Sequence, residues 1–355
     1  MVALADAFAR SGHAVTLVLL CRGGVGVPRP EEHVRVVELG ASSVVAAAAP
    51  FTRWLVEARP DAVLATLVAP SFLAVAASRL VSRAHRPRVV VREANTLTAA
   101  LAFRPRAFRA ASRLAVRLAY PRADAIIAVS EGAAVDLARV LGAAGQRIVT
   151  IPNPAILPGA AGRERGPVAH RWLGEPPGAR DAAVVVAAGR LVRKKGFDVL
   201  LEATARARRR RELRVVILGE GPERGALESR VAALGLGDVV ALPGFVDDPL
   251  AWFARADLFV LSSFTEGMPN AMLQAMAAGC PVVATDCPSG PREVLEDGRW
   301  GVLVPPGDAV ALADAIVAEL GSPRPRSDSR VRAEAFRIDP IAAQYADLLF
   351  GGDPR

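Results

Sequence analysis

The stretch AAVVVAAGRLVRKKG, residues Ala182–Gly196, joins an apolar run to a glycine and a group of basic side chains. An apolar run of this length predicts a buried strand of a parallel sheet. The chain contains only two lysines, Lys194 and Lys195, and uses arginine elsewhere, which indicates a site that needs a compact ammonium group. Basic residues at the carboxyl end of such a strand predict an anion-binding site. A solvated basic turn is the alternative interpretation.

Short apolar runs, mostly separated by segments long enough for a helix, continue in both directions from this stretch. Before it they predict strands at Ala14–Leu20, Val34–Leu39, Ala62–Leu67, Arg88–Val91, Ala125–Val129 and Ile148–Ile151. From it onward they predict strands at Ala182–Ala188, Arg214–Leu218, Val239–Leu242, Leu258–Leu261, Pro281–Ala284 and Gly301–Val304. Alternating strands and helices are typical of α/β domains with parallel sheets. We therefore expect two such domains.

A segment rich in Pro, Gly and Arg, Pro152–Asp181, separates the two series of strands and predicts the linker region. We expect a first domain over residues 1–155 and a second over 156–337, with the last helix, in 338–355, packing back onto the first domain. A doubly wound domain normally opens on a buried strand and a glycine-rich turn. Here the helical pattern Val2–Arg10 comes first. Either the first domain lacks its usual N-terminal strand or the sequence begins after it.

The composition narrows the class of protein. With 355 residues, 52% of them hydrophobic, the chain can bury large cores. Its three cysteines, Cys21, Cys280 and Cys287, are too few for a disulfide framework and lack metal-ligand spacing, which predicts a reducing compartment and no metal. The uncharged stretch Ala62–Ser78 contains Pro70 and is shorter than the ~20 residues of a membrane-spanning helix. Without a signal-peptide pattern, we expect a cytoplasmic protein.

The excess of positive charge lies in the first half of the chain. Between Arg79 and Arg122, eleven arginines stand against one carboxylate, that of Glu93. Such a surface attracts nucleic acid or an anionic membrane leaflet. Because no nucleic-acid-binding module accompanies it, we expect peripheral binding to the inner face of the plasma membrane and no nucleic acid; a solvated helical face is the alternative. The segment Phe103–Tyr120 mixes arginines with large apolar side chains, as an interfacial helix does.

Two further loops follow predicted strands of the second half, where ligands of such folds bind. The first, Ser262–Asn270, reads SSFTEGMPN and leads into a helix whose first amides can bind phosphate or sugar oxygens. The second, Asp286–Glu293, is stiffened by two prolines. An arginine, a lysine and a helix amino terminus together would stabilise a departing nucleoside diphosphate without a metal ion. Because the chain lacks an Asp-x-Asp motif, a metal-bridged diphosphate is not expected.

Several strings of the second half resemble the donor domain of the family-4 glycosyltransferases. They are GRLVRKKG, LGEGPE, LPGFVDD, SSFTEGMPNAMLQAMAAGCPVVATD and CPSGPREVLEDGRWGVLVPPGD, within residues 182–318. In the first half, RADAIIAVSE at Arg122–Glu131 and the segment Ile151–Pro154 support the resemblance. It implies the GT-B fold, an α/β architecture of two Rossmann-like, doubly wound parallel-sheet domains facing across a cleft. It also implies sugar transfer with retention of configuration.

The resemblance assigns roles to residues at the matching positions. Arg190 and Lys195 would hold the donor diphosphate and Glu266 would contact the transferred sugar, which makes these three the expected catalytic residues. The segment Leu242–Phe245 resembles the strip that lies along the nucleotide base. The expected donor-binding residues are Gly189, Arg190, Lys195, Gly219, Gly244, Phe245, Glu266, Gly267, Met268, Pro269, Asn270, Ala271 and Gln274.

The chain departs from the family pattern at three places. The family's second glutamate, which holds the ribose hydroxyls, is replaced by Gln274, and the loss of charge-assisted hydrogen bonds predicts donor binding weaker by roughly 1 kcal/mol. Many relatives have a histidine after the fourth strand of the first domain, where this chain has Arg92, Glu93 and Asn95. These three are candidates for the acceptor side; helix capping and surface pairing are the alternative. The glycine-rich loop before the first helix is absent together with its strand.

The predicted activity is transfer of a hexosyl or N-acetylhexosaminyl unit from a nucleotide-sugar, expected to be UDP-linked, to a lipid-linked or saccharide acceptor held by the first domain. The strings EGMPN and CPSGPREVL are similar to members that extend polyprenyl-diphosphate-linked oligosaccharides for surface polysaccharides. No cofactor is expected, because the nucleotide-sugar is a co-substrate. The alternatives are a non-catalytic or truncated sugar-nucleotide-binding protein and a GT-B epimerase or phosphorylase.

A glycine pattern in the second half imitates a dinucleotide fingerprint. Gly219, Gly221 and Gly225 follow a predicted strand, but their spacing is G-x-G-x-x-x-G, and no acidic residue ends the next predicted strand. A glycine pattern without that acidic residue is a weak indication of nicotinamide binding. A nicotinamide dehydrogenase is therefore not expected.

Overall fold

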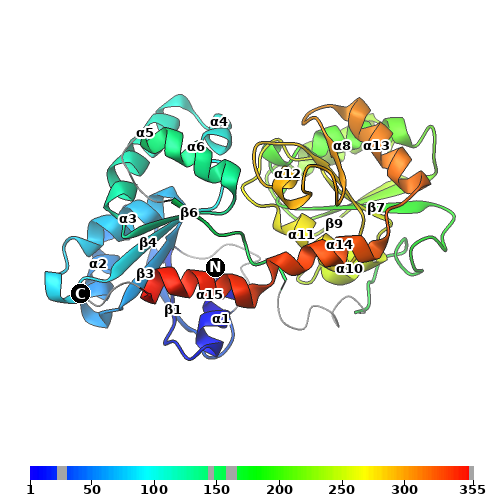
Figure 1. The fold of residues 1–355 in the computed structure, drawn as a ribbon. Coiled ribbons are helices and arrows are strands. Elements are labelled where there is room, and N and C mark those ends of the chain that lie inside the picture. Colours follow the sequence, from blue (N-terminus) through cyan, green and yellow to red (C-terminus); the bar gives the residue numbers. More distant parts are fainter. Residues whose placement is uncertain (22–29, 143–147, 157–165, 352–355) are drawn as a thin grey trace. The chain divides into compact units, whose positions relative to one another are not determined.

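The computed structural model describes residues 1–21, 30–142, 148–156 and 166–351. The chain divides into two compact units, and each is described by itself (Figure 1). Unit 1 comprises Met1–Pro154 together with Ile338–Arg355, and unit 2 comprises Ala155–Arg337. Both units contain parallel sheets with helices between most of the successive strands, which confirms the α/β class expected from the sequence.

Unit 1 alternates helices and strands and ends with the last helix of the chain. Its strands are β1 (Thr16–Cys21), β2 (Arg35–Ala41), β3 (Ala62–Thr66), β4 (Arg88–Glu93), β5 (Ala125–Ala128) and β6 (Ile148–Thr150). Its α-helices are α1 (Val2–Arg10), α2 (Ala48–Ala58), α3 (Val68–Ser78), α4 (Leu97–Ala102), α5 (Arg106–Ala119), α6 (Glu131–Leu141) and α15 (Ile338–Phe350). Short 3-10 turns lie at Arg83–His85 and Tyr120–Arg122.

The strands of unit 1 form two separate parallel sheets. β1 pairs with β2, whereas β3, β4, β5 and β6 form a four-stranded sheet in sequence order. Val18 and Leu20 of β1 pack on the same apolar core as the four-stranded sheet, a core that includes Val91, Tyr120 and Leu137. β1 is half-buried throughout and β3 over most of its length, whereas β4 is almost entirely buried. Among the described strands, β1 and β3 do not pair, so the parallel sheet of this unit is interrupted between them.

The C-terminal helix α15 packs against elements from the beginning of unit 1. In Figure 1 it lies beside α1, with β3 close by. The ring of His13 stacks on that of Phe350, with 4.5 Å between their centroids. Arg88 of β4 donates from Nε to the carbonyl oxygen of Leu348 over 2.8 Å. α15 is therefore an integral part of this unit, although about half of the chain separates it from the other elements.

Unit 2 also alternates strands and helices. Its strands are β7 (Ala183–Ala188), β8 (Leu213–Leu218), β9 (Val240–Gly244), β10 (Leu258–Leu261), β11 (Val282–Thr285) and β12 (Val302–Val304). Its α-helices are α8 (Phe197–Ala207), α9 (Arg224–Ala233), α10 (Leu250–Arg255), α11 (Asn270–Ala277), α12 (Pro291–Val294), α13 (Ala309–Gly321) and α14 (Arg326–Ala333). Short 3-10 turns lie at Arg193–Lys195 and Glu334–Phe336.

The six strands of unit 2 form one parallel sheet in the order β12-β11-β10-β7-β8-β9. The chain runs outward from β7 through β8 to β9 and then returns to β10 on the other side of β7. Apolar side chains of the strands and of α8 and α13 share one core, represented by Val185, Leu200, Ile217, Leu258 and Leu312. This is a doubly wound sheet whose order reverses between β7 and β10, and such a reversal positions a ligand.

Each predicted strand is present, with ends that differ by at most two residues; the first, for example, spans Thr16–Cys21 instead of Ala14–Leu20. In the predicted linker Pro152–Asp181, the described residues form no helix or strand beyond an isolated bridge between Ile156 and Arg337, and residues 157–165 lie outside the described ranges. None of the helices that the structure describes is long and apolar enough to span a bilayer.

Candidate functional site

The sheet of unit 2 places the carboxyl ends of β7 and β10 next to each other. These strands pair in parallel, with Leu258 opposite Val185 and Phe259 opposite Val186. Because both then end at the same edge of the sheet, the loop that carries Lys195 meets the loop that carries Glu266. The order of the strands reverses at this point, where doubly wound folds bind ligands. The loops of Lys195 and Glu266 therefore meet at the edge of the sheet where the sequence predicts the ligand.

Lys195 and Glu266 form an ion pair in which Nζ lies 2.6 Å from Oε1. Their side chains are 19% and 7% exposed, so the pair is largely shielded from water. The hydroxyl group of Ser263 donates a second hydrogen bond to the same carboxylate oxygen, over 2.6 Å. A carboxylate with two such donors has a fixed position and orientation.

The backbone of the two loops is joined around Gly196. The amide of Phe264 donates to the carbonyl oxygen of Lys194 over 2.8 Å, and the hydroxyl of Ser262 donates to that of Lys195 over 2.9 Å. Gly196 has a φ of 62°, and a Cβ atom there would lie 2.1 Å from the carbonyl oxygen of Ser262. No other residue fits this position without moving one loop from the other.

Glycines also bring the ends of β7, β8 and β9 close together. Gly219 has a φ of 134°, and a Cβ atom there would lie 2.0 Å from the carbonyl oxygen of Gly189. The amide of Gly219 donates to the carbonyl oxygen of Gly244 over 2.8 Å. A Cβ atom on Gly189 would in turn lie 3.4 Å from Cε of Lys195. Gly189, Gly219 and Gly244, three of the predicted donor-binding glycines, therefore form one cluster beside the Lys195 side chain.

The loop before α12 also contacts the loop that carries Glu266. Gly290 has a φ of 86°, and a Cβ atom there would lie 2.8 Å from the carbonyl oxygen of Gly267. The hydroxyl of Ser289 donates to the carbonyl oxygen of Glu266 over 3.3 Å. In the same loop the thiol of Cys287 is buried, and this burial, with the nearby Glu266 carboxylate, raises its pKa to about 12. The thiol is therefore protonated at neutral pH.

Helix α11 starts at the end of the glutamate loop. Pro269 is the residue before its first turn, and Met268, in the loop itself, is buried. The first amides of a helix have no partner inside the helix and can bind an anion. Asn270 is exposed, while Ala271 and Gln274 are half-buried on the same side of α11. Gln274 thus lies one turn beyond the amino terminus, as its spacing from Glu266 predicts.

Two predicted donor-binding side chains stand at the surface. Arg190 is exposed, and in the part of the chain that the structure describes its guanidinium group forms no hydrogen bond or ion pair. Phe245, the residue after β9, is 49% exposed. The structure thus brings Lys195 and Glu266 into direct contact, whereas Arg190 belongs to the same loop without bonding to either of them. An unpaired guanidinium and an exposed ring are both available to a ligand.

Arg92, a candidate for the acceptor side in unit 1, is buried at the end of β4. Its Nε donates to the hydroxyl oxygen of Tyr345 over 2.8 Å and its Nη1 to that of Thr66 over 3.1 Å. Its Nη2 donates to the amide oxygen of Asn153. The guanidinium therefore joins β4 to α15, β3 and the segment after β6. Neither helix capping nor surface pairing, the alternatives from the sequence, describes this residue.

Glu93, the neighbouring candidate, is 2% exposed. Its Oε2 accepts a hydrogen bond from the hydroxyl group of Tyr120 over 3.1 Å, and its Oε1 accepts one from the amide of Asn95 over 3.2 Å. Burial raises the pKa of this carboxyl group to about 7, although the hydrogen bond from Tyr120 acts in the opposite direction. Glu93 is thus a buried group that titrates near neutrality, and surface pairing does not describe it. Asn95 is half-buried beside it.

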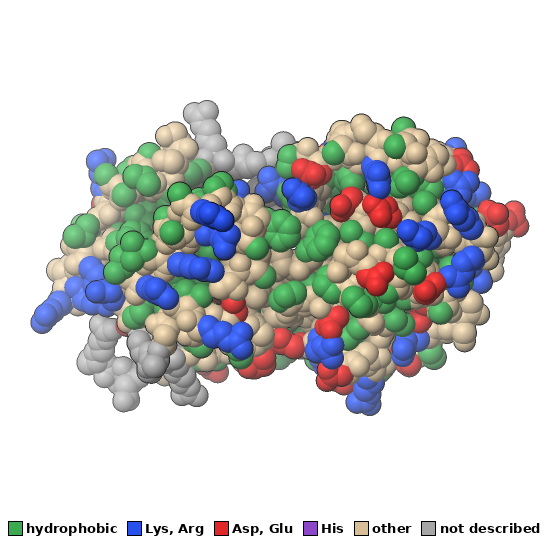
Figure 2. All heavy atoms as spheres, turned by 90° about the horizontal axis from the view of Figure 1, so that it is seen from above, with side chains coloured by type: hydrophobic (Ala, Val, Ile, Leu, Met, Phe, Trp, Pro, Cys, Tyr) green, Lys and Arg blue, Asp and Glu red, His purple; other side chains and the backbone are tan. Residues whose placement is uncertain are grey.

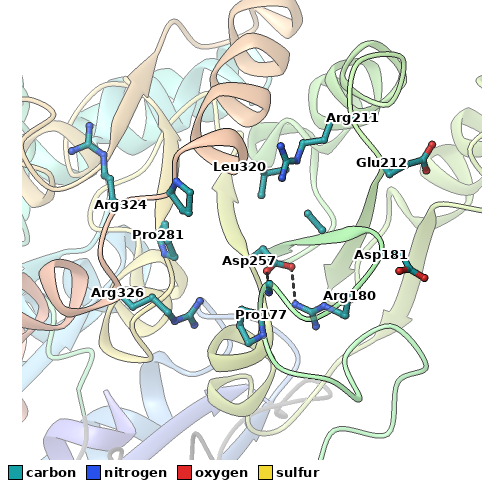
Figure 3. Close-up of a pocket in the computed structure, with 13 residues that line it drawn as sticks. Pro177, Arg180, Asp181, Arg211, Glu212, Asp257, Pro281, Leu320, Arg324 and Arg326 are labelled. Atoms are coloured by element: carbon teal, nitrogen blue, oxygen red, sulfur yellow. Dashed lines mark hydrogen bonds and ion pairs between the residues drawn. The ribbon is translucent and has the colours of Figure 1, made fainter.

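A cavity of about 550 Å³ lies at the opposite edge of the unit 2 sheet, next to the amino ends of β7, β8, β10 and β11 (Figure 3). Three of its charged side chains, those of Arg180, Asp257 and Arg326, bond to other groups of the protein. Arg180 pairs with Asp257 at 2.7 Å, and the same carboxylate accepts the amide of Val184. Arg326 donates to the carbonyl oxygens of Ala254 and Ala256 at the end of α10. The cavity contains none of the predicted donor-binding residues and is separate from the candidate site.

Sequence reasoning did not assign a role to Ser263, Ser289 or Tyr345. Ser263 stands three residues before Glu266 in the same motif, and this spacing is the one signal that could have identified it as a partner of the carboxylate. The other two have no signal in the sequence. The hydroxyl of Ser289 bonds to a backbone carbonyl, and Tyr345 is 253 residues from Arg92, which it contacts. Among the described residues, no group of three His, Cys, Asp or Glu side chains could hold a metal ion.

Curated relatives resemble parts of this chain. An exopolysaccharide phosphotransferase of Streptomyces coelicolor is 33% identical over 69% of this chain and 25% of its own length. A lipopolysaccharide core biosynthesis glycosyltransferase, LpsE, of Rhizobium meliloti is 40% identical over 38% of this chain and 39% of its own length. An N-acetylgalactosamine-N,N'-diacetylbacillosaminyl-diphospho-undecaprenol 4-alpha-N-acetylgalactosaminyltransferase of Campylobacter jejuni is 27% identical over 68% and 64%. The chain thus spans between a quarter and somewhat less than two thirds of these relatives.

Solved structures share the fold over nearly the whole chain. Sucrose-phosphate synthase from Thermosynechococcus elongatus has a TM-score of 0.82 at 22% identity, over 97% of this chain and 90% of its own. HepE of Anabaena, in complex with UDP and glucose, has a TM-score of 0.79 at 21% identity, over 99% and 95%. At this identity the likeness concerns the fold, and it confirms the predicted GT-B class with two Rossmann-like domains.

Two family models match consecutive parts of the chain. The model described as Glycosyltransferase Family 4 matches residues 1–157. The model described as Glycosyl transferases group 1 matches residues 182–321, which include the joined loops of Lys195 and Glu266. The two halves of the chain are thus similar, in turn, to two glycosyltransferase models, each of which matches less than half of its length.

Proposed function

We propose that this protein is a retaining glycosyltransferase. It moves a hexosyl or N-acetylhexosaminyl unit from a UDP-linked sugar, bound by unit 2, to a lipid-linked or saccharide acceptor, bound by unit 1. The observation that carries the proposal is the contact between Lys195 and Glu266 at the reversal of the unit 2 sheet. A cation for a phosphate and a carboxylate for sugar hydroxyls stand there side by side.

The groups around this contact match the parts of a nucleotide-sugar. The Lys195 ammonium group and the Arg190 guanidinium group, on one loop, are suited to the diphosphate, together with the amino terminus of α11. Glu266 is held by Ser263 and accepts hydrogen bonds from the sugar. We assign the ribose hydroxyls to Gln274, one turn along α11, and the nucleotide base to the exposed ring of Phe245.

In the proposed reaction, the bond between the anomeric carbon and the diphosphate oxygen breaks, and the nucleoside diphosphate leaves with the electron pair. The acceptor oxygen forms a new bond to the anomeric carbon on the same face, and its proton passes to the departing phosphate. Lys195 and Arg190 stabilise the negative charge that develops on the leaving group. The backbone around Gly196 is close-packed and Lys195 is paired with Glu266, so the Lys195 ammonium group is fixed in position before the substrate binds.

The identities of donor and acceptor are proposals supported by the relatives. HepE of Anabaena is solved with UDP and glucose, and the Campylobacter relative is named for an undecaprenol-linked acceptor. Because side chains can supply the positive charge at the diphosphate, we propose a reaction that needs no metal ion or other cofactor. We also propose a cytoplasmic protein that works at the inner face of the plasma membrane, where a lipid-linked acceptor is found.

A non-catalytic sugar-nucleotide-binding protein is the second candidate. Among the described strands of unit 1, β1 and β2 form a sheet separate from that of β3–β6, and this interruption favours it. Such a protein would bind UDP-sugars through unit 2 and show no turnover.

One assay separates these functions. The protein is incubated with UDP- and GDP-sugars, with and without a polyprenyl-diphosphate-linked oligosaccharide, while release of nucleoside diphosphate and the configuration of the product are followed. A transferase gives acceptor-dependent release and a retained anomer, with slow donor hydrolysis alone. Binding without release supports the second candidate. Epimerisation or phosphorolysis of the sugar without an acceptor contradicts the proposal and indicates an epimerase or a phosphorylase.

A further inference from the structure

Helix α5 of unit 1 presents an apolar stripe to solvent. Ala107, Ala111, Leu114 and Leu118 recur at the spacing of one helix face, and all four are exposed. Leu114 is 57% and Leu118 46% exposed. A surface helix of a soluble protein normally turns its apolar face to the core and its polar face to water. The outward face of α5 is therefore unusual and needs a partner.

Arginines border this stripe along the length of the helix. Arg106, Arg113 and Arg117 follow a parallel row, with Arg109 beside it. In the described part of the chain, no carboxylate pairs with any of these four guanidinium groups, and the side chains of Arg106, Arg109 and Arg113 form no hydrogen bond. The one carboxylate between Arg79 and Arg122, that of Glu93, is buried. The positive charge of α5 is therefore not neutralised within the described residues.

The two rows together form a surface that we call the α5 face: Arg106, Ala107, Arg109, Ala111, Arg113, Leu114, Arg117 and Leu118. Figure 2 shows blue basic side chains among green hydrophobic ones over the part of unit 1 where α4, α5 and α6 lie. The ring of Phe108, 51% exposed with the guanidinium of Arg104 5.4 Å from its centre, extends the same composition to the start of the helix. Red carboxylates are few in this region of the picture.

The orientation of α5 is fixed by its other side. Ser112, Val116 and Ala119 are buried, and Val116 and Ala119 belong to the core of unit 1. Arg117 donates from Nε to the carbonyl oxygen of Val140 at the end of α6 over 2.8 Å. The apolar stripe therefore cannot turn inward without breaking this core. Substitutions at Arg106, Arg113, Leu114 and Leu118 leave these contacts of Val116, Ala119 and Arg117 in place.

We propose that the α5 face binds an anionic phospholipid bilayer, with Leu114 and Leu118 inserted among the acyl chains and the flanking arginines on the lipid phosphates. The phosphate backbone of a nucleic acid would use the arginines but leave the leucines exposed to water. A second copy of the chain would bring two unpaired arginine rows together, and their repulsion opposes that contact. An interfacial helix combines apolar and cationic groups in this way because the acyl chains and the phosphates of a bilayer lie next to each other at its surface.

This inference deepens the proposed function, because a lipid-linked acceptor lies in such a bilayer, but its test is independent of turnover. The whole chain is sedimented with vesicles of phosphatidylcholine, alone or with phosphatidylglycerol, at low and high salt. We expect binding to the anionic vesicles that decreases as salt is added. The pair Arg106→Ser with Arg113→Ser should lower the partition coefficient about 25-fold, because each arginine near an anionic surface contributes a factor of about five.

The apolar stripe has its own variant, Leu114→Ser with Leu118→Ser, which should lower the partition coefficient at least tenfold with no change of net charge. Matched controls lie in unit 2: Arg206→Ser with Arg209→Ser removes the same charge from exposed positions, and Val331→Ser changes a side chain that is 64% exposed. Both controls should bind as the wild type does. Equal losses in the control pair would mean binding by net charge alone and would overturn the proposal.

A fluorescent variant tests insertion even if a serine variant proves unstable. Leu114→Trp should show emission shifted to the blue when anionic vesicles are added, because the indole enters a less polar environment. An unshifted spectrum overturns the proposal, as does binding of RNA that competes with vesicles and is unchanged in the leucine variant. Donor hydrolysis without vesicles should be the same in all α5 variants, so failure of vesicle binding and failure of the transferase proposal are recognised separately.

Discussion

The ammonium nitrogen of Lys195 lies 2.6 Å from a carboxylate oxygen of Glu266, a residue 71 positions further along the chain. The contact joins the loops that follow β7 and β10, the two strands between which the sheet order reverses. Each loop would be an ordinary polar turn by itself. Together they place opposite charges where a doubly wound fold binds its ligand. The following predictions test whether this contact serves catalysis, the fold or both.

Lys195→Ala should lower kcat/KM about 100- to 1,000-fold, because it removes a fixed positive charge from the leaving diphosphate. Lys194→Ala is the matched control, since it removes the same side chain one position earlier, and it should change kcat/KM by less than about threefold. Steady-state release of UDP measures both. Equal losses in the two variants would contradict the assignment of Lys195.

The ion pair should also contribute to folding, separately from catalysis. Lys195→Met leaves the buried Glu266 carboxylate without its cation and should lower the free energy of unfolding by about 2 kcal/mol. Adding Glu266→Gln removes the unpaired charge and should recover most of that loss, while turnover stays low. Chemical denaturation and the UDP assay measure the two effects. A double variant that regains activity would show that the pair has only a structural role.

Gly196→Ala should disrupt the contact between the two loops. Gly235 has nearly the same backbone conformation, with φ of 63° against 62°, but a Cβ atom there would meet nothing within 4 Å. Gly235→Ala should therefore cost only the strain of a left-handed residue, about 1 kcal/mol. Gly196→Ala adds the clash with the Ser262 carbonyl and should cost at least ~2 kcal/mol more, with weaker donor binding. Similar unfolding free energies for both variants would contradict the close packing described here.

Gln274→Glu should strengthen donor binding, because a carboxylate accepts charge-assisted hydrogen bonds from the ribose hydroxyls. The expected gain is about 1 kcal/mol, equivalent to a KM for the donor about fivefold lower. Gln344→Glu, on the exposed side of α15, is the control and should leave KM unchanged. A higher KM in the Gln274 variant would mean that this side chain does not face the ribose.

Glu93 should make the stability of unit 1 depend on pH. Burial raises its pKa from 4.5 to about 7, so between these values the folded state binds more protons than the unfolded state. Its effect on the free energy of unfolding is therefore most favourable below about pH 4.5 and is lost as the pH rises to about 7. Glu93→Gln should remove this dependence and stabilise the protein at pH 8 by roughly 1–3 kcal/mol. The exposed control Glu57→Gln should keep the wild-type profile, and a profile unchanged by Glu93→Gln would refute the assignment.

The strands and the donor loops could be predicted because their signals are local. An apolar run such as Ala182–Ala188 determines a buried strand by itself, and the spacing of the glycines around Lys195 and Glu266 reflects backbone approaches that no other residue allows. Parallel pairing then brings the carboxyl ends of neighbouring strands to one edge. For these reasons the order of motifs along the sequence indicated where they meet.

The environment of Arg92 and Glu93 could not be predicted, because it depends on distant partners. The sequence suggested cleft residues or surface pairs, yet both side chains are buried. Arg92 meets Tyr345, 253 residues away, and Glu93 meets Tyr120. No local pattern reports such contacts, which exist only after α5 and α15 have packed on the sheet. The sequence therefore did not indicate that Arg92 and Glu93 help to hold the fold of unit 1 together.

The anchoring of α15 by Arg88 and Arg92 has a consequence for biosynthesis. A ribosome makes β4 and its two arginines early, but the helix that accepts their hydrogen bonds is among the last segments to emerge. Until then the nascent first unit has two guanidinium groups and an apolar surface without their native cover, whereas all strands of the second unit are already complete. The later half of the gene product should consequently acquire its native structure before the earlier half, and a premature stop codon ahead of residue 338 should yield a polypeptide that chaperones retain.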